Sequence, residues 1–381
     1  MLIYLDNATT SYPKPTIISD AIEYSILNFV SPNRSSHELA LKSSEALYET
    51  RETLANLFNI KDSSHLIFTP GATHSINYVL KGFKWKKNDC IIISPLEHNA
   101  VYHPLMTLKK KYDLDIVIMP YVKHKGFDIN ELEKCLKEKN VRLIALTHAS
   151  NVTGEVLPVR KTIALAREYG IQVLLDGSQS AGNFSVDISD LDVNYFAFSG
   201  HKYLLGPGGT GGLYIKDDNF LEPLIEGGTG LEDTTDKLSL KMPEKFEAGT
   251  FNVSSIWALN SSISFLSSEG IENIYKLKKE LISLSVDALN RINNITCYSS
   301  RQNNVGIISF NINNRSPGEV AMMLDKKYKI CVRAGLHCSL QAHHSIGTYP
   351  KGCVRASIGC FNSKDDLRNF IKAIKEIAEA I

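Results

Sequence analysis

Short runs of apolar residues alternate with longer mixed stretches along the first half of the chain. Runs of this length, separated by stretches long enough for a helix, are typical of parallel β-sheets with helical crossovers. Seven runs are expected to be strands: His65–Thr69, Cys90–Ser94, Asp115–Met119, Arg142–Thr147, Gln172–Asp176, Tyr195–Ser199 and Gly211–Ile215. Because only a glycine-rich loop joins the last two, we expect that pair to be antiparallel. The pattern therefore predicts an α/β fold with a mainly parallel, seven-stranded sheet.

The remaining segments predict further helices and a second, smaller unit. Apolar residues recur with helical spacing in Thr16–Phe29, in a stretch that ends near Phe58, and from about Ser254 to Ile292. Further elements are expected at Val305–Phe310 (strand), Pro317–Lys327 (helix), Val354–Ser357 (strand) and after the capping box Ser363 to Asp366 (helix). We expect a large domain of residues 16–252, a smaller α+β domain of residues 1–15 and 253–381, and an excursion loop over residues 226–246.

Composition narrows the classes of partner and compartment. The 381 residues carry a formal net charge of +1, and no basic run is interleaved with aromatic residues, so neither nucleic acid nor an anionic membrane is an implied partner. No run approaches the ~18 apolar residues of a membrane-spanning helix, and no signal peptide is visible. The seven cysteines are scattered, odd in number and without a CxxC pair, which favours reduced thiols and a cytoplasmic location.

Two charged residues lie at the ends of consecutive predicted strands. Lys202 lies just beyond one of them, and Asp176 ends the strand before it. A lysine amine is costly to bury unless it is paired or used covalently. A Schiff base to an aldehyde cofactor needs such an amine, and the same cofactor needs a carboxylate at its ring nitrogen. Alone, each residue is better explained as a surface lysine or a helix-capping aspartate, but their joint placement favours the cofactor.

Other polar residues are expected at the same edge of the sheet, because ligands bind beyond the carboxyl ends of parallel strands. Gly71-Ala72-Thr73 forms a strand-to-helix turn whose free N–H groups suit a phosphate, although any capped helix looks similar. His98 could stack on a flat ring and transfer protons. Asn151 and Gln179 could bond the ring or the substrate. His37, near a helix start, is either a capping residue or a contact to the substrate.

A second dense group of polar residues begins at Arg333. Cys338 lies in a polar loop downstream of it, and positive surroundings make an accessible thiol nucleophilic, whereas most free cysteines are simply buried. Arg355 lies on an apolar strand, so its guanidinium needs a partner, either a substrate carboxylate or a structural one. A metal site is the other interpretation of this region, but its candidate ligands are crowded in sequence and we expect no bound metal: His337, Cys338, His343 and His344.

Eight motifs together resemble those of a known family: YLDNATTSYPKP, GATHSIN, LEHNA, HASNVTGEV, LLDGSQSAG, FSGHKYLLGPGGTGGLYI, FEAGTFN and RAGLHC…VRASIG. Over essentially its whole length the chain resembles class V aminotransferase-family proteins, and among them the group II cysteine desulfurases and selenocysteine lyases. SGHK with the upstream D-x-x-Q is highly specific for the family, and RxGxHC marks group II. The resemblance implies a pyridoxal 5'-phosphate (PLP) enzyme of fold type I that acts as a homodimer with active sites at the subunit interface.

The resemblance also implies roles for individual residues. Lys202 would bond the cofactor, Asp176 would hold its pyridine nitrogen protonated and Gln179 would bond its ring hydroxyl. His98 would stack on the ring and donate a proton. The phosphate contacts would be Ala72, Thr73, Ser199, His201 and, from the neighbouring subunit, Thr250. Asn151 and Arg355 would orient the substrate carboxylate, with Asn151 also near the cofactor, and Cys338 would become a persulfide on a mobile loop.

The implied reaction converts L-cysteine to L-alanine and passes the sulfur to Cys338 and then to an acceptor protein. The nearest alternative is a selenocysteine β-lyase, which need not depend on Cys338 because a selenol leaves more easily. A non-catalytic sulfur-carrier scaffold is disfavoured by the intact Asp176, Lys202 and His98, and a transaminase would leave Cys338 without a task. Three departures from the family pattern leave substrate and acceptor preference open: Ala72 for a hydroxyl residue, His74 for an acidic one and Ser339 for alanine.

Overall fold

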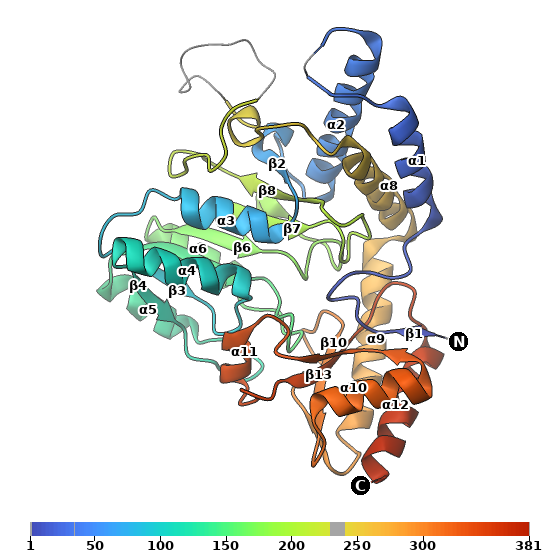
Figure 1. Ribbon diagram of the computed structural model, residues 1–381. Coiled ribbons are helices and arrows are strands. Elements are labelled where there is room, and N and C mark those ends of the chain that lie inside the picture. The colour runs from blue at the N-terminus through green and yellow to red at the C-terminus, as the bar shows by residue number, and fades with distance from the viewer. Residues whose placement is uncertain (1, 34, 229–240, 381) are drawn as a thin grey trace.

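A seven-stranded sheet forms the centre of the protein, a computed structural model in which residues 2–33, 35–228 and 241–380 are described (Figure 1). The strand order is β2-β8-β7-β6-β5-β3-β4. The strands are β2 (Leu66–Thr69), β3 (Cys90–Ile93), β4 (Asp115–Ile118), β5 (Val141–Thr147), β6 (Gln172–Asp176), β7 (Tyr195–Ser199) and β8 (Gly211–Ile215). β8 is antiparallel to β2 and β7, and the other neighbouring pairs are parallel. The predicted α/β sheet is confirmed, with each strand end within one residue of its predicted position.

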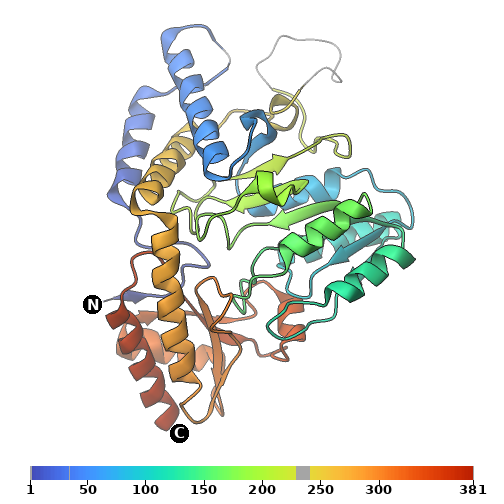
Figure 2. The same cartoon turned by 180° about the vertical axis from the view of Figure 1, so that it is seen from behind.

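Helices cover both faces of this sheet because successive strand residues point to opposite sides. Leu174 and Ala197 pack into a core with helices α3 and α4, whereas Leu175 and Phe196 pack into a core with α5 and α6. Figures 1 and 2 show these helix pairs on the two sides of the sheet. The helices are α3 (Ala72–Gly82), α4 (Asn99–Tyr112), α5 (Ile129–Glu138), α6 (Val159–Glu168) and the short α7 (Ile188–Leu191). Full burial of each Leu or Phe contributes roughly 1.5–3 kcal/mol.

Three helices pack together at one end of the molecule: α1 (Thr16–Asn28), α2 (Glu38–Leu57) and α8 (Val253–Glu269). The single helical region predicted from Ser254 to Ile292 is instead divided between α8 and α9 (Ile271–Leu289). Gly270 between them has φ 79°, a left-handed conformation that ends one helix and redirects the chain into the next. α8 buries Leu259 in the same core as α5 and α6. The predicted domain division assigns α8 to the smaller domain and stays a prediction.

The C-terminal part contains a four-stranded antiparallel sheet in the order β12-β13-β10-β9. Its elements are β9 (Ile295–Cys297), β10 (Ile307–Ile312), α10 (Pro317–Tyr328), β11 (Ile330–Cys331), β12 (Arg333–Gly335), α11 (Leu340–Ser345), β13 (Cys353–Ser357) and α12 (Lys364–Glu379). β10 starts two residues later than predicted, because the side chain of Asn304 accepts the backbone N–H groups of Gly306 and Ile307 and holds them in a turn. The capping box at Ser363 is confirmed.

The N-terminal segment joins this part across the full length of the sequence. β1 (Ile3–Tyr4) pairs in parallel with β11, with Ile3 opposite Ile330. The side chain of Asn7 donates to the backbone oxygen of Ser357 on β13 at 3.0 Å. The residues that follow β1 therefore run between the C-terminal sheet and the carboxyl ends of the central strands.

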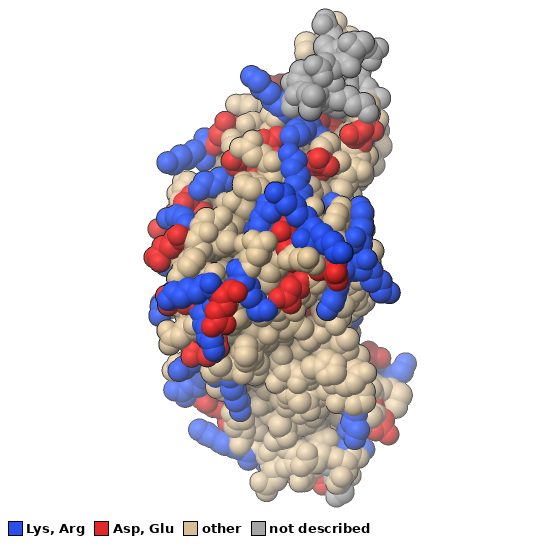
Figure 3. Space-filling model, turned by 90° about the vertical axis from the view of Figure 1, so that its left-hand side faces the viewer, with Lys and Arg blue, Asp and Glu red and all other residues tan. Residues whose placement is uncertain are grey.

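The surface carries both signs of charge. On the face shown in Figure 3, Lys and Arg are interspersed with Asp and Glu over the upper part, and the lower part is mostly uncharged. Within the described residues, none of the helices combines the length and the apolar character needed to cross a membrane.

Candidate active site

Nine of the ten predicted cofactor contacts line one cavity at the carboxyl ends of β5, β6 and β7. They are Ala72, Thr73, His98, Asn151, Asp176, Gln179, Ser199, His201 and Lys202. They come from segments that are far apart in sequence, and the parallel strands bring them together because the carboxyl ends of such strands meet at one edge of the sheet.

Lys202 enters the cavity from the loop after β7. The loop passes through Gly200, where a Cβ would lie 2.2 Å from Thr210 Oγ1, so this close approach requires glycine. Burial lowers the pKa of Lys202 from 10.5 to about 8, Asp176 raises it, and Arg355 and Arg333 lower it further. More of the amine is therefore neutral near pH 7 than in an ordinary lysine, and the neutral amine is the form that attacks an aldehyde.

Asp176 and Gln179 contribute further polar atoms to the lining of the cavity. Oδ1 of Asp176 accepts the backbone N–H of Ser178 at 2.9 Å and its hydroxyl at 2.5 Å, which fixes the carboxylate at the end of β6. Gln179 Nε2 donates to the backbone oxygen of Ala8 at 3.2 Å. Gln179 Oε1 is buried and has no hydrogen-bond partner among the described residues. Such an orphaned atom in a cavity wall is expected where a ligand supplies the partner.

The N-terminus of α3 supplies an anion-binding end. Gly71 precedes the helix with φ 149°, and a Cβ there would lie 3.4 Å from Ser199 Oγ. The Ala72 N–H donates to Ser199 Oγ at 3.0 Å, which leaves the hydroxyl hydrogen of Ser199 for another acceptor. Thr73 adds a second hydroxyl to the lining. Together with the helix dipole these donors suit a phosphate.

His98 is the N-cap of α4 and presents a neutral ring to the cavity. Its Nδ1 accepts the N–H of Ala100 at 3.0 Å, so the ring hydrogen of the neutral form is on Nε2. Burial, and then the charge of Lys202, lower the pKa of His98 to about 4. Burial also lowers the pKa of His201 to about 4. A neutral imidazole at this place can stack on a flat ring and donate through Nε2.

Cys338 lies in a tight turn that two asparagines hold against the cavity. His337 and Cys338 both have left-handed backbones, with φ 49° and 58°. Nδ2 of Asn151 donates to the backbone oxygen of His337 at 2.8 Å, and its Oδ1 accepts the hydroxyl of Ser339 at 2.6 Å. The backbone N–H of Asn99 donates to the Cys338 oxygen at 2.7 Å. The exposed Cys338 lines an open hollow whose lining shares Thr73, His98 and Ala100 with the first cavity.

Two arginines connect this turn with the N-terminal segment. Arg333 Nη2 lies 3.2 Å from Cys338 Sγ, where the guanidinium can stabilise negative charge on the sulfur. Arg355 is 1% exposed, and its Nη2 donates to Asp6 Oδ1 at 2.9 Å and to Thr9 Oγ1 at 2.7 Å. Both interpretations of Arg355 therefore remain, since the structural ion pair is formed while Nε has no partner among the described residues.

Some predicted residues are not brought to the cavity within one chain. His37 is exposed and caps α2, with its Nδ1 accepting the N–H of Ala40 at 3.2 Å, so its contact to substrate stays a prediction. Thr250 is exposed and does not line the cavity. Within the excursion loop predicted over 226–246, residues 229–240 lie outside the described residues. Of the four candidate metal ligands, Cys338 contacts Arg333, and the ring of His344 lies 4.1 Å from that of Tyr349.

The sequence analysis missed four positioning residues: Asp6, Thr9, Asn99 and Ser339. Asp6 and Thr9 were quoted only as part of a motif, and Ser339 only as a departure from one. Each of these residues bonds a residue more than 180 positions away in the sequence. The N-terminal motif was the available signal, because it places several polar residues directly after a short apolar run.

The lining fits PLP. A lysine with a lowered pKa, a fixed carboxylate, an orphaned amide oxygen and a helix N-terminus with hydroxyl donors match the aldehyde, ring nitrogen, ring hydroxyl and phosphate of this cofactor. A mutant C-DES structure with glycine covalently linked to its PLP cofactor shares the fold with a TM-score of 0.82 at 23% identity, covering 98% of this chain and 96% of that one.

Comparisons with known proteins give the family. The chain is 33% identical to a probable cysteine desulfurase of Methanothermobacter thermautotrophicus, over 99% of this chain and 94% of that protein. It is 32% identical to a probable cysteine desulfurase of Pyrococcus abyssi, over 100% and 95%. The apo structure of the cysteine desulfurase from Thermococcus onnurineus NA1 superposes with a TM-score of 0.92 at 30% identity, covering 100% and 95%. The family model for class V aminotransferases matches residues 3–370, and the protein belongs to this family of PLP enzymes.

Proposed function

We propose that the protein is a PLP-dependent cysteine desulfurase that converts L-cysteine to L-alanine and retains the sulfur as a persulfide on Cys338. The position of Cys338 carries the proposal. Its sulfur is exposed, lies 3.2 Å from the Arg333 guanidinium and faces a hollow continuous with the lining of the Lys202 cavity through Thr73, His98 and Ala100. The relatives named as cysteine desulfurases support this substrate.

The residues around the cavity have distinct tasks. When bound, the PLP ring supplies an electron sink for the carbanion at the substrate α-carbon. Asp176 would hold a proton on the ring nitrogen, which would strengthen that sink. The Lys202 amine takes the α-proton, and its pKa of about 8 keeps a substantial neutral fraction near neutral pH. His98 would cover the ring as a neutral imidazole, and Arg355 with Asn151 would orient the substrate carboxylate.

The transfer of sulfur to Cys338 needs no external oxidant, because the substrate itself takes up the electron pair. The Cys338 thiolate attacks the substrate sulfur, so that a new S–S bond forms and the substrate Cβ–S bond breaks. The electron pair of the broken bond remains with the carbon fragment, which takes up protons and leaves as alanine. The enzyme then carries one extra sulfur atom on Cys338, which an acceptor protein or a small thiol removes.

The discriminating experiment compares L-cysteine and L-selenocysteine in wild type and Cys338→Ala, with alanine as the measured product. We expect the variant to lose alanine formation from cysteine and largely to keep it from selenocysteine. Wild-type activity on selenocysteine alone would identify a selenocysteine β-lyase instead. An equal loss on both substrates would remove support for that alternative. Protein that stays colourless after incubation with PLP would indicate a non-catalytic sulfur-carrier scaffold.

Assembly and location complete the proposal. We place the enzyme in the cytoplasm as a homodimer, with Thr250 of one subunit completing the phosphate site of the other. Thr250 is exposed on its own chain, and the exposed apolar residues Ile26, Leu27 and Tyr48 on α1 and α2 provide a surface that another subunit could cover. The free cysteines are consistent with a reducing compartment. Light scattering tests the dimer, and Thr250→Ala is expected to weaken PLP retention.

A further inference from the structure

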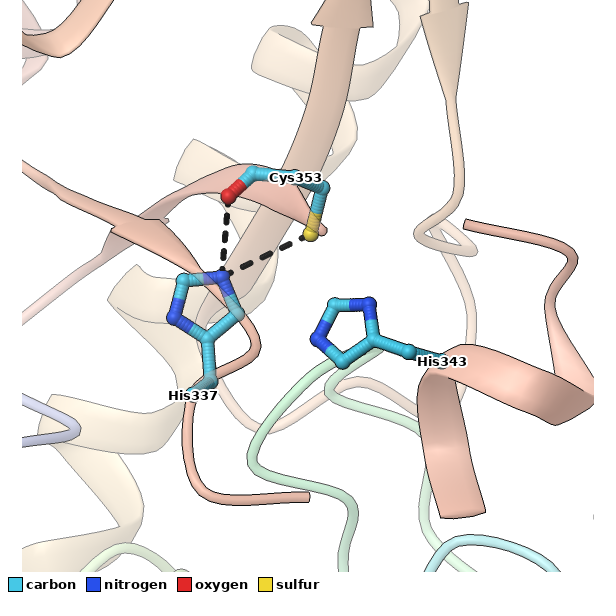
Figure 4. A group of neighbouring side chains, drawn as sticks. All are labelled: His337, His343 and Cys353. Carbon is cyan, nitrogen blue, oxygen red and sulfur yellow. Dashed lines mark hydrogen bonds between the residues drawn. The ribbon is translucent and has the colours of Figure 1, made fainter. Parts of the chain in front are cut away.

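Three metal-ligating side chains meet beneath the turn that carries Cys338. His337, His343 and Cys353 each present one ligand atom, and these atoms lie within 4.8 Å of one another. The residues come from the turn, α11 and β13, and are 2%, 0% and 0% exposed. Figure 4 shows the two imidazole rings and the sulfur facing a common point. This group differs from the set considered from sequence, because Cys353 takes the place of Cys338 and His344.

The hydrogen bonds of His343 leave its Nε2 available as a ligand atom, whereas Nε2 of His337 already contacts Cys353. Nε2 of His343 is buried and has no hydrogen-bond partner in the described part of the chain. Nδ1 of the same ring lies 2.6 Å from Thr348 Oγ1, which orients the ring in the way an outer partner orients a metal-bound imidazole. Nε2 of His337 lies 3.1 Å from the backbone oxygen of Cys353 and 3.5 Å from its Sγ. Metal binding at this atom replaces the hydrogen bond to the oxygen and moves the ring proton to Nδ1, which has no partner among the described residues. For a three-coordinate metal with ligand angles near 120°, bonds of about 2.3 Å to sulfur and 2.05 Å to nitrogen would give an N–S separation of about 3.8 Å.

The net charge of the three ligand side chains indicates which class of metal ion suits the site. Two neutral imidazoles and one thiolate carry a charge of −1, so a monovalent ion gives a neutral buried site and a divalent ion leaves it positive. The charged side chain that acts on all three residues is the cation Arg355, and Arg333 acts on His337 as well. Asp6, the carboxylate of this neighbourhood, is paired with Arg355. A soft monovalent ion is therefore favoured, since thiolate and imidazole ligands suit copper(I).

We propose that His337 Nε2, His343 Nε2 and Cys353 Sγ form a buried three-coordinate site for a soft monovalent metal ion of the copper(I) class. On binding, the Cys353 thiol releases its proton to solvent and the sulfur bonds the metal, with no change in oxidation state. The site stands apart from the PLP cavity and does not depend on the desulfurase reaction. The metal would tie the residue before Cys338 to β13 and α11.

Copper(I) binding to the PLP-loaded enzyme tests the proposal. Cys338 is first blocked with iodoacetamide, and one equivalent of copper(I) is supplied anaerobically in the absence of cysteine. Bathocuproine disulfonate measures affinity by competition, and copper K-edge absorption identifies the ligands. Cys353→Ser and His343→Gln remove ligands, and Thr348→Val removes only the outer partner of His343. The matched controls are Cys297→Ser, a thiol two strands away, and His344→Gln, the neighbouring histidine.

We expect wild type and both controls to bind one copper(I) with one sulfur and two imidazole nitrogens. Each ligand variant should bind at least about tenfold more weakly, and Thr348→Val about tenfold more weakly. Circular dichroism establishes that the variants are folded, and Thr348→Val keeps the test decisive if a ligand variant does not fold. Coordination by two or more sulfurs, wild-type affinity in either ligand variant, or displacement by equimolar zinc(II) would overturn the proposal.

Discussion

Replacing Arg333 with glutamine is expected to slow alanine formation from cysteine about tenfold while sparing selenocysteine. The guanidinium lies 3.2 Å from Cys338 Sγ, and Cys338 is exposed, so water screens their interaction. Two unit charges at this separation attract by about 1.3 kcal/mol at the dielectric constant of water. Because 1.36 kcal/mol corresponds to a factor of ten in rate, losing the charge should cost close to one order of magnitude in kcat/KM for cysteine.

Selenocysteine serves as the internal control, because a selenol leaves without attack by Cys338. Initial rates of alanine formation are measured for both substrates in wild type, Arg333→Gln and Arg333→Lys. Lysine keeps the charge and should give an intermediate rate with cysteine. Arg301→Gln is the matched surface control, because Arg301 is exposed and paired with Asp287. Equal slowing with both substrates would show that Arg333 acts through Thr9 or the cofactor site, and no slowing would refute its action on the sulfur.

Three further predictions concern proton binding and packing. The rate at which the apoenzyme binds PLP, followed by cofactor absorbance, should rise with pH. We expect the midpoint of this rise near pH 8, because the pKa of Lys202 is lowered to about 8. A midpoint near pH 10.5, the value for an ordinary lysine, would contradict this prediction. Burial lowers the pKa of Lys278 to about 7. Between pH 7 and 9 the unfolded chain therefore binds more protons at this lysine than the folded protein does, and the folded protein becomes more stable as the pH rises. Over this range the unfolding free energy of wild type should rise by about 2 kcal/mol relative to that of Lys278→Met. If denaturant titration finds the same difference in unfolding free energy between the two proteins at both pH values, Lys278 does not have the lowered pKa. Gly177→Ala should lose about 1–3 kcal/mol of stability, because a Cβ would lie 2.2 Å from the Phe196 ring, whereas Gly208→Ala, with open space around it, should be neutral.

The central sheet and most cavity residues could be predicted because their signals are local. Each strand is a short apolar run, and Asp176 and Lys202 follow such runs directly. The break at Gly270 was missed because a single glycine within a long helical pattern can be tolerated without ending the helix. Pairing between β1 and β11 was missed because strands of two residues carry no periodicity.

The hydrogen bonds that hold the Cys338 turn could not be predicted for a different reason. Asn151 and His337 are 186 positions apart, and their contact depends on how the C-terminal sheet is placed against the central one. Cys353 likewise looks like an ordinary core residue of an apolar strand. Its sulfur becomes a candidate metal ligand only when the positions of His337 and His343 are known.

The two interpretations of Arg355 are compatible because they use different atoms. Nη2 is engaged by Asp6 and Thr9, and Nη1 donates to the backbone oxygen of Asn151 at 2.9 Å. A buried guanidinium without a carboxylate would be strongly destabilising, so Asp6 is needed when no substrate is bound. In the described part of the chain Nε has no partner, and a substrate carboxylate could bond it without breaking the pair with Asp6. Thr9 also lies 3.3 Å from Arg333, so one short N-terminal segment contacts both Arg355, the proposed partner of the substrate carboxylate, and Arg333, beside the proposed acceptor sulfur. The relative placement of the two guanidinium groups therefore depends on a segment whose polar side chains also bond each other, with Thr9 Oγ1 donating to Asp6 Oδ1 at 2.8 Å.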